Sequence, residues 1–510
     1  MEISNHRQPS FFSALMIGVG SIIGSGWLFA SYYASKFAGP VAILSWVIGA
    51  VIALILALLL GEIATIYQER GLSSRLLTIT HNRDFGFIIA ISNWFALIAV
   101  IPSEAMATVQ YLSMTFPKLS HIIFAGDDLT TMGVVFADVL IVIYGLLNYW
   151  GVRTLATANN LISSIKLVVP TVTGIAILAA AFHPQNFTAY HQTIAPYGID
   201  KAFTAVVSCG IFYAFYGFSM ITMFAKDLKN PKRNLPLALV GSVAICLVIY
   251  LILQVAFIGA IDPTKVATQG WHTLNFTSPL AELAILLGLN WLSIVLYADA
   301  ALSPSGTAIV YVGSSAQNLT SMAEDRQVPR FFAHIHPLYS ISRSAIVFAL
   351  LICFGLVLFF NNWQKIIVVV TVLELLSCVA IPVAFTKLRD AKVDKLRSFK
   401  LPFGKTISLF AYFVVTYLLT QSGVNALVLA LVLHIFFFLV YCASYYKLQV
   451  KKTVAAFKSS WTMFAYLILI TIGGWLQAND KLHRPDVLLM FFAVALMTYI
   501  LLLWQKNYNE

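Results

Sequence analysis

The chain has 510 residues, of which 60% are hydrophobic and 10% are charged, and its mean hydropathy is +0.85. A soluble globular domain carries about a quarter charged residues, so the composition excludes a water-soluble protein and predicts an integral membrane protein. The net charge of +11 would suit a nucleic-acid partner, but the basic residues gather in loops between apolar segments. We therefore expect a lipid bilayer and no nucleic acid as the partner.

Apolar segments long enough to cross a bilayer recur along the chain. A spanning helix needs about 20 apolar residues, and in lipid a helix satisfies its own backbone hydrogen bonds. The sequence therefore predicts an all-α polytopic fold with about 14 transmembrane helices. The segments lie near residues 11–31, 39–66, 87–115, 130–150, 158–182, 201–224, 235–260, 280–317, 343–361, 363–387, 405–422, 424–446, 459–477 and 486–504.

The loops between these segments indicate an orientation. With the N-terminus in the cytoplasm, 24 of the 32 Lys and Arg residues fall on the cytoplasmic side and seven fall outside. This is the positive-inside bias, and an even number of helices then places both termini in the cytoplasm. The basic segment Lys387–Gly404 contains Pro402. It predicts a boundary between a ten-helix core, residues 1–390, and four additional C-terminal helices, residues 391–510.

Two segments contain glycines where a continuous helix would not favour them. The first carries Gly18, Gly20, Gly24 and Gly26 within nine residues, and each glycine costs a helix about 1 kcal/mol relative to alanine. The sixth has Gly217 in an aromatic midsection. Glycine-interrupted segments at matching places in two halves predict the binding site of a transporter. The alternative is a Gly-xxx-Gly packing face, and the paired positions favour a broken-helix site.

Four runs of residues point to one family. They are Gly20–Gly26; Phe215–Phe218 with Lys229–Pro236; Leu302–Thr307 with Ala323–Asp325 and Val328–Pro329; and Leu147–Val152 with Asn159, Asn160 and Lys166. Together they resemble signatures of the amino acid–polyamine–organocation (APC) superfamily permeases, and among these the bacterial aspartate–proton symporter-like permeases. The resemblance implies a leucine-transporter-type five-plus-five inverted repeat in which helices 1 and 6 are discontinuous. It also implies a location in the bacterial inner (plasma) membrane.

The resemblance implies an amino-acid site at the two helix breaks. Its substrate-binding residues would be Ile22, Ser25, Gly26, Tyr213, Tyr216 and Tyr311. Helix-end amides bind a carboxylate and helix-end carbonyls bind an ammonium group. The Ser25 hydroxyl and the nearby amides would take the substrate carboxylate, and the carbonyls of Ile22, Tyr213 and Tyr216 would take the amino group. The alternative for each aromatic residue is packing against lipid or a neighbouring helix.

Ionisable residues inside the segments are candidates for proton coupling, because their burial is costly. Lys166 resembles a lysine that takes the place of a sodium ion in proton-coupled relatives, and its alternative is a permanently charged structural brace. Three acids, Glu104, Asp299 and Glu374, are secondary candidates. For Glu374 a protonated acid bonded to a neighbouring helix is an equal alternative. Many relatives carry a glutamate where this chain has Ser219, so a role for that glutamate does not transfer.

These observations predict a secondary active transporter, most simply a proton-coupled symporter of an L-amino acid. Aspartate or glutamate is suggested by the subgroup resemblance alone. An amino acid exchanger and an amino-acid-binding membrane sensor without turnover are the alternatives. The sequence contains no phosphate-binding loop, no paired His/Cys cluster and no Gly-x-Ser-x-Gly motif, so we expect no enzyme activity, no cofactor and no metal site.

Overall fold

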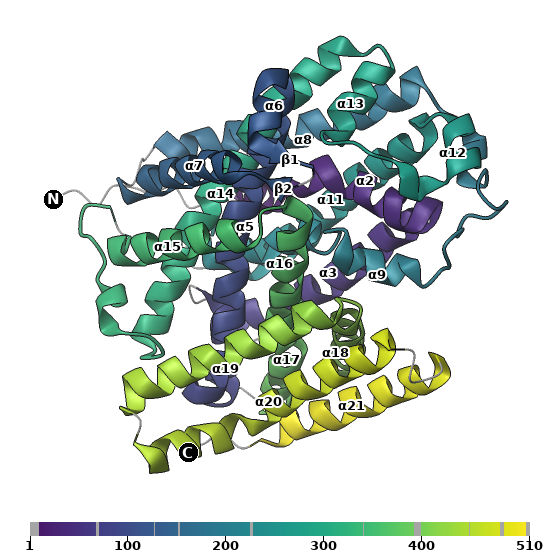
Figure 1. The fold of residues 1–510 in the computed structure, drawn as a ribbon. Helices are drawn as coiled ribbons and strands as arrows, with labels where there is room; N and C mark the ends of the chain where they lie inside the picture. The colour runs from purple at the N-terminus through teal and green to yellow at the C-terminus, as the bar shows by residue number, and fades with distance from the viewer. Residues whose placement is uncertain are drawn as a thin grey trace.

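The computed structural model describes residues 10–67, 71–126, 128–150, 154–224, 228–339, 341–391, 399–447, 449–479 and 484–505. Among these residues the regular secondary structure is helical apart from one antiparallel pair of short strands (Figure 1). The elements are α1 (Phe11–Ile22), α2 (Gly26–Ala38), η1 (Gly39–Val41), α3 (Ala42–Ile66), α4 (Leu72–Thr80), α5 (Arg83–Thr115), α6 (Pro117–Ile123), β1 (Phe124–Ala125), β2 (Asp128–Leu129), α7 (Thr131–Tyr149), α8 (Thr154–Ala180), η2 (Pro184–Phe187), α9 (Lys201–Ser208), α10 (Tyr213–Tyr216), η3 (Gly217–Phe224), α11 (Pro231–Ala260), α12 (Pro263–Gln269), η4 (Trp271–Thr273), α13 (Pro279–Leu286), α14 (Asn290–Glu324), η5 (Arg330–Ala333), α15 (Arg343–Phe359), α16 (Trp363–Cys378), α17 (Ala380–Asp390), α18 (Gly404–Thr420), α19 (Val424–Tyr446), α20 (Val450–Ala478) and α21 (Arg484–Trp504).

The predicted apolar segments fall on helices. Within the described residues, nine helices are long and apolar enough to cross a membrane, or ten if one bent pair counts as a single span. Four shorter apolar helices lie at Phe11–Ile22, Arg343–Phe359, Gly404–Thr420 and Leu489–Trp504. The polytopic helical class is therefore confirmed, whereas the number of fourteen crossings stays a prediction. One predicted segment, 280–317, is two helices, α13 and α14, because Gly288 between them has φ of +74°.

Two helical segments are interrupted, the first at the predicted glycines and the second at Gly210, seven residues before the predicted Gly217. After α1 the backbone is extended at Ile23, with φ −81° and ψ 94°, and the helix resumes as α2 at Gly26. The helical segment 201–222 bends by 63° between α9 and α10, around Gly210 with φ of +76°. Gly217 lies against the first break, because a Cβ there would be 2.2 Å from the carbonyl oxygen of Ser21.

The glycines of the first segment also allow close packing, as the alternative interpretation expected. A Cβ on Gly20 would lie 2.2 Å from Oγ of Ser163 in α8, and one on Gly24 would lie 2.3 Å from Oε1 of Glu104 in α5. The two glycines thus contact different helices and do not form one dimer-like face. The first segment is therefore both interrupted and closely packed around these glycines.

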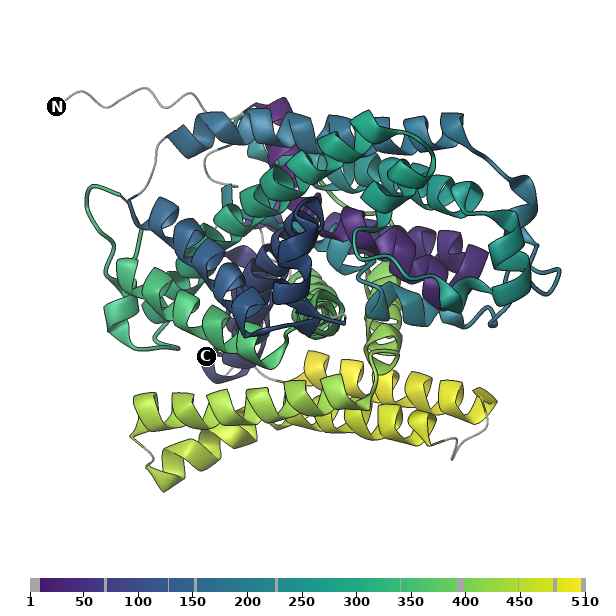
Figure 2. The ribbon, with the colours of Figure 1, turned by 45° about the horizontal axis from the view of Figure 1, so that its top comes forward.

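The last three helices of the chain form a layer of their own. Both ribbon views show α19, α20 and α21, coloured green to yellow, side by side along one side of the other helices (Figure 1 and Figure 2). α5 is the buried centre of the remainder, and it packs against α7, α14 and α16. The predicted boundary at residue 390 adjoins residues 392–398, which lie outside the described residues, so the division into two domains stays a prediction.

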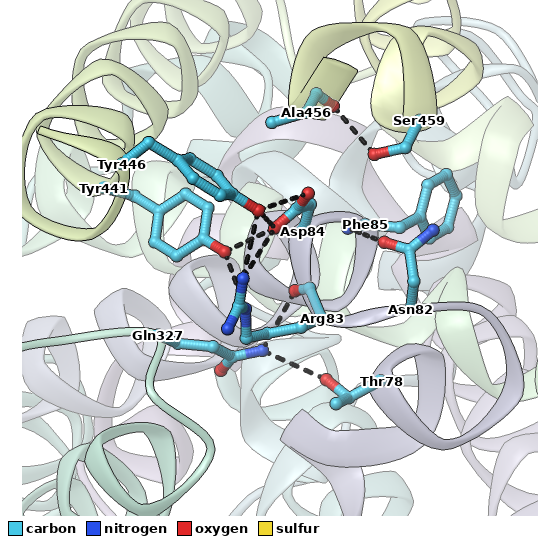
Figure 3. Close-up of polar contacts among 10 residues, drawn as sticks. All are labelled: Thr78, Asn82, Arg83, Asp84, Phe85, Gln327, Tyr441, Tyr446, Ala456 and Ser459. Atoms are coloured by element: carbon cyan, nitrogen blue, oxygen red, sulfur yellow. Dashed lines mark hydrogen bonds and ion pairs between the residues drawn. The ribbon is translucent and has the colours of Figure 1, made fainter. Parts of the chain in front are cut away.

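A cluster of polar side chains joins this layer to the core. Figure 3 shows Arg83 and Asp84, at the start of α5, against Tyr441 and Tyr446 near the end of α19. Arg83 Nε donates to the Tyr441 hydroxyl (2.9 Å) and the Tyr446 hydroxyl donates to Asp84 Oδ1 (2.8 Å). Gln327, just beyond the end of α14, donates to Thr78 Oγ1 (3.0 Å). The ends of α5, α14 and α19 therefore meet on one side of the molecule, as the alternation of predicted loops requires.

Candidate functional site

The start of α2 is the centre of the site. Ser25 precedes the first turn of this helix, and its backbone amide donates to Glu104 Oε2 (2.8 Å). The Tyr213 hydroxyl, at the start of α10, donates to the other carboxylate oxygen of Glu104. The Ser25 hydroxyl accepts from Trp363 Nε1 (3.0 Å). A helix N-terminus favours negative charge, so the structure places a carboxylate of the protein where the resemblance implies the carboxylate of a substrate.

Two first-turn amides of α2 remain beside this carboxylate. Leu28 N donates to Ser25 O (3.0 Å), but the amides of Gly26 and Trp27 have no backbone acceptor among the described residues. Unpaired amides are usual at the start of a helix and are satisfied by caps, water or ligands. Gly26 faces α10 closely, since a Cβ on it would lie 3.1 Å from Cβ of Ala214. The break therefore leaves hydrogen-bond donors next to Tyr213.

The structure brings Ser25, Gly26 and Tyr213 together, but it gives Ile22 and Tyr216 other partners. The Ile22 carbonyl accepts from Gly24 N (3.1 Å) and lies 3.4 Å from the Tyr250 hydroxyl. The Tyr250 hydroxyl also donates to Ala214 O (3.0 Å) and so spans both breaks. Sequence reasoning did not identify Tyr250, because an isolated tyrosine in the apolar segment of α11 carries no signal of its partners.

The Tyr216 hydroxyl belongs to a separate buried network. It accepts from Asn93 Nδ2 (2.8 Å) and lies 3.2 Å from Ser377 Oγ. Asn318 Nδ2 donates to Asn93 Oδ1 (2.6 Å). The network joins α5, α10, α14 and α16, and Tyr311 is buried elsewhere in α14. None of its amides was a candidate from the sequence.

Lys166 bridges three helices beside the first break. Its side chain is 2% exposed. Nζ donates to Gly20 O (2.8 Å) in α1 and to Thr307 Oγ1 (2.5 Å) in α14, while Lys166 itself is in α8. Thr307 Oγ1 also lies 3.3 Å from Ile23 O. The ammonium group therefore lies between α1, α8 and α14.

The remaining acids differ in their surroundings. Asp299 and Glu374 are buried. The Asp299 carboxylate interacts with the Ser303 hydroxyl of the same helix, whereas the oxygens of Glu374 have no hydrogen-bond partner within the described part of the chain. A hydrogen bond of Glu374 to a neighbouring helix stays a prediction. Asp299 interacts electrostatically with Lys166, and Glu374 with Tyr216 and Tyr311. The Oγ atom of Ser219 is likewise buried and has no hydrogen-bond partner within the described part of the chain.

The site has the groups to hold a small zwitterion and a proton. Helix-end amides and hydroxyls face the α2 break, a carboxylate and an ammonium group lie near it, and aromatic rings surround them. No group of three or more His, Cys, Asp or Glu residues suited to a metal ion occurs in the described ranges.

Comparisons with known proteins concern the family of the whole chain. Residues 10–472 match the family model described as "Amino acid permease". The chain is 41% identical over 399 residues to "Glutamate/serine transporter AimA" of Bacillus subtilis (strain 168), a match that covers 78% of this chain and 74% of the relative. It is 30% identical over 474 residues to "Aspartate-proton symporter" of the same organism, covering 92% and 90% respectively.

A solved structure shares the fold. The crystal structure of the Eremococcus coleocola manganese transporter superposes with a TM-score of 0.53 over 90% of this chain and 99% of that one. The sequence identity is 12%, so the likeness concerns the fold alone. A helical transporter fold in an integral membrane protein therefore agrees with the apolar helices described above.

Proposed function

This chain belongs to the amino acid permease family, and we propose that it is a secondary active transporter that moves an L-amino acid together with a proton. One observation carries the proposal: the start of α2 binds a carboxylate, that of Glu104, beside the two further amides of Gly26 and Trp27. A pocket that already holds one carboxylate on a helix end is suited to the carboxylate that all amino acids share.

The substrate site follows from the two breaks. We place the substrate carboxylate on the amides of Gly26 and Trp27 and on the Ser25 hydroxyl. We place its amino group among the carbonyls of Ile22, Tyr213 and Tyr216, with Tyr311 beside its side chain. The Ile22 carbonyl oxygen lies 3.4 Å from the Tyr250 hydroxyl, and the amino group of the substrate would take the place of this contact.

Coupling to protons follows from the position of Glu104. Two carboxylates that share one helix end repel each other, and a proton on one of them removes the repulsion. Binding of substrate next to Glu104 therefore draws in a proton. Lys166, which bridges α1, α8 and α14, is the second coupling group, because its ammonium holds the first break in this geometry. Asp299 and Glu374 are further proton carriers in this proposal.

We also propose the topology of the helices, their orientation in the membrane and the first substrates to test. The breaks at α1/α2 and α9/α10 support a five-plus-five inverted repeat, with four additional helices after residue 390 and fourteen crossings in all. The charge distribution supports a cytoplasmic location of both termini, and the similarity to bacterial permeases supports the plasma membrane. The names of the two relatives make L-glutamate, L-aspartate and L-serine the first substrates to test.

Transport by the purified protein in vesicles tests the proposal. Vesicles that contain buffer only receive an inward proton gradient and a panel of radiolabelled amino acids, with a protonophore in a parallel sample. Accumulation that needs no internal amino acid and disappears with the protonophore is the expected result. Uptake that requires internal amino acid makes the protein an exchanger. Saturable binding without uptake of any panel member makes it a sensor, and both outcomes overturn the symport proposal.

A further inference from the structure

A groove beside the start of α15 has a cationic end and an apolar end. Its volume is about 430 Å³, and it lies between the end of α7, the short helix η5 and the first turns of α15. Arg343 is at one end of the groove, and Val347 and Leu351 are at the other. None of the residues that line this groove, which we name the Arg343 groove, belongs to the proposed transport site.

Aromatic rings position the guanidinium group of Arg343. Its guanidinium lies over the ring of Tyr149 (4.3 Å to the ring centroid) and of Tyr339 (4.8 Å). Its Nε donates to the Tyr149 carbonyl (3.4 Å). No carboxylate forms an ion pair with Arg343 among the residues that the structure describes. Such ring contacts restrict the side chain and leave its remaining N–H donors free for an anion.

The apolar end continues along one face of the same helix. Val347 and Leu351 follow Arg343 at intervals of four residues, so the three side chains lie in a row. With a rise of 1.5 Å per residue, Val347 is about 6 Å and Leu351 about 12 Å further along the helix axis. The two side chains are 48% and 60% exposed, and Phe331 of η5, which also lines the groove, is 58% exposed.

A cationic side chain followed by a row of apolar side chains matches the structure of a phospholipid. α15 is apolar from Ala345 onward, so Arg343 marks the boundary of the hydrocarbon region and the row beyond it faces acyl chains. A phospholipid has its phosphate at this boundary and its chains beyond it. Basic pockets between transmembrane helices on the cytoplasmic side bind anionic headgroups, and the charge distribution predicts that this end of α15 is cytoplasmic.

We propose that the Arg343 groove binds one anionic phospholipid, with its phosphate on the Arg343 guanidinium and one acyl chain along Val347 and Leu351. The bound lipid joins α7, η5 and α15 at their shared end. The lipid is favoured over a second copy of the chain because the groove presents a cation that has no acid partner among the described residues.

Lipid binding to the purified full-length protein in detergent tests this proposal by native mass spectrometry. The ligands are phosphatidylglycerol, phosphatidylcholine with the same acyl chains, and inorganic phosphate as a competitor. We expect phosphatidylglycerol to bind more tightly than phosphatidylcholine. Arg343→Gln weakens phosphatidylglycerol binding at one site by about fivefold, the effect of about 1 kcal/mol per basic residue at a membrane surface.

Two further variants separate the causes. Leu351→Trp fills the apolar end at an exposed position and is expected to weaken both lipids while it leaves the charge intact. Arg233→Gln removes an exposed arginine at the start of α11 and serves as the matched control with unchanged binding. Wild-type binding in both groove variants overturns the proposal. So does displacement of the lipid by inorganic phosphate, which identifies a site for free anions, or a change from dimer to monomer in the variants, which identifies a second copy as the occupant.

Discussion

The backbone amide of Ser25 donates a hydrogen bond to Oε2 of Glu104 (2.8 Å), although the two residues are 79 positions apart in the chain. The protein therefore keeps one of its own carboxylates at the start of α2. Because the Tyr213 hydroxyl donates to the same carboxylate, Glu104 connects the first break to the second. A change of charge at Glu104 consequently alters its hydrogen bonds to both interrupted segments.

Glu104→Gln is expected to separate binding from coupling. A glutamine keeps an oxygen that accepts from Ser25 N but cannot exchange a proton, so proton-driven accumulation is lost while exchange of internal for external amino acid persists. Paired assays of gradient-driven uptake and exchange in vesicles measure the two activities. Glu324→Gln, at the exposed end of α14, is the control with normal uptake. Full accumulation by Glu104→Gln would contradict the role given to Glu104.

Lys166→Ala is expected to abolish accumulation against a gradient. The substitution leaves Gly20 O and Thr307 Oγ1 without the ammonium donor, and a buried polar group without its partner costs about 1–3 kcal/mol. The first break then loses its brace as well as its charge. Uptake as a function of external pH checks the prediction, with Lys365→Ala, an exposed lysine that pairs with Asp128, as the control. The idea fails if Lys166→Ala accumulates substrate with the normal pH dependence.

Gly217→Ala is expected to block transport by forcing the two breaks apart. The new Cβ would lie 2.2 Å from the Ser21 carbonyl oxygen, and this backbone atom cannot rotate away as a side chain can. The variant should lose uptake and melt at a lower temperature than wild type, by an overpacking cost of about 1–3 kcal/mol. Gly355→Ala, in α15, meets nothing within 4 Å and should behave as wild type. Equal uptake by the two variants would show that the close approach is not required.

His81 is expected to make stability depend on pH. It lies between α4 and α5, and its Nε2 is 2.9 Å from the Leu502 carbonyl oxygen in α21. Burial, assisted by the nearby charge of Lys387, lowers the pKa of His81 from 6.5 to about 3. The unfolded chain therefore binds the proton first as pH falls, so folding stability is complete above about pH 6.5 and decreases between 6.5 and 3. The slope is about 1.4 kcal/mol per pH unit.

Thermal melting of the detergent-solubilised protein between pH 7.5 and pH 5 measures this effect. His81→Asn should show a smaller decrease than wild type over that range. His121→Asn, which changes an exposed histidine, should melt with the wild-type pH dependence. An unchanged slope in His81→Asn would assign the acid sensitivity to other groups.

The helical class and the first break could be predicted from the sequence, because both depend on local properties: segment length and apolarity determine a span, and glycines such as Gly24 weaken a helix. The second segment was predicted to break at Gly217, but it bends around Gly210. Gly217 instead allows the close approach to the Ser21 carbonyl oxygen, which only the packing of the two segments reveals. Residues 280–317 were predicted as one span, because a single glycine, Gly288, does not interrupt an apolar pattern. In the structure the positive φ of Gly288 separates two helices. The Arg343 groove could not be predicted, because its walls come from α7, η5 and α15.

The sequence by itself determined a polytopic helical carrier with two interrupted helices, and it singled out Lys166 as the basic residue inside a span. Only the tertiary structure decided which groups meet at the breaks: Glu104 on the Ser25 amide, Tyr250 between Ile22 and Ala214, and Tyr216 in a network with Asn93. The physical reason is that a local pattern reports how costly a residue is to bury or to hold in a helix. The partner that offsets this cost comes from a helix far along the chain, and packing alone selects it.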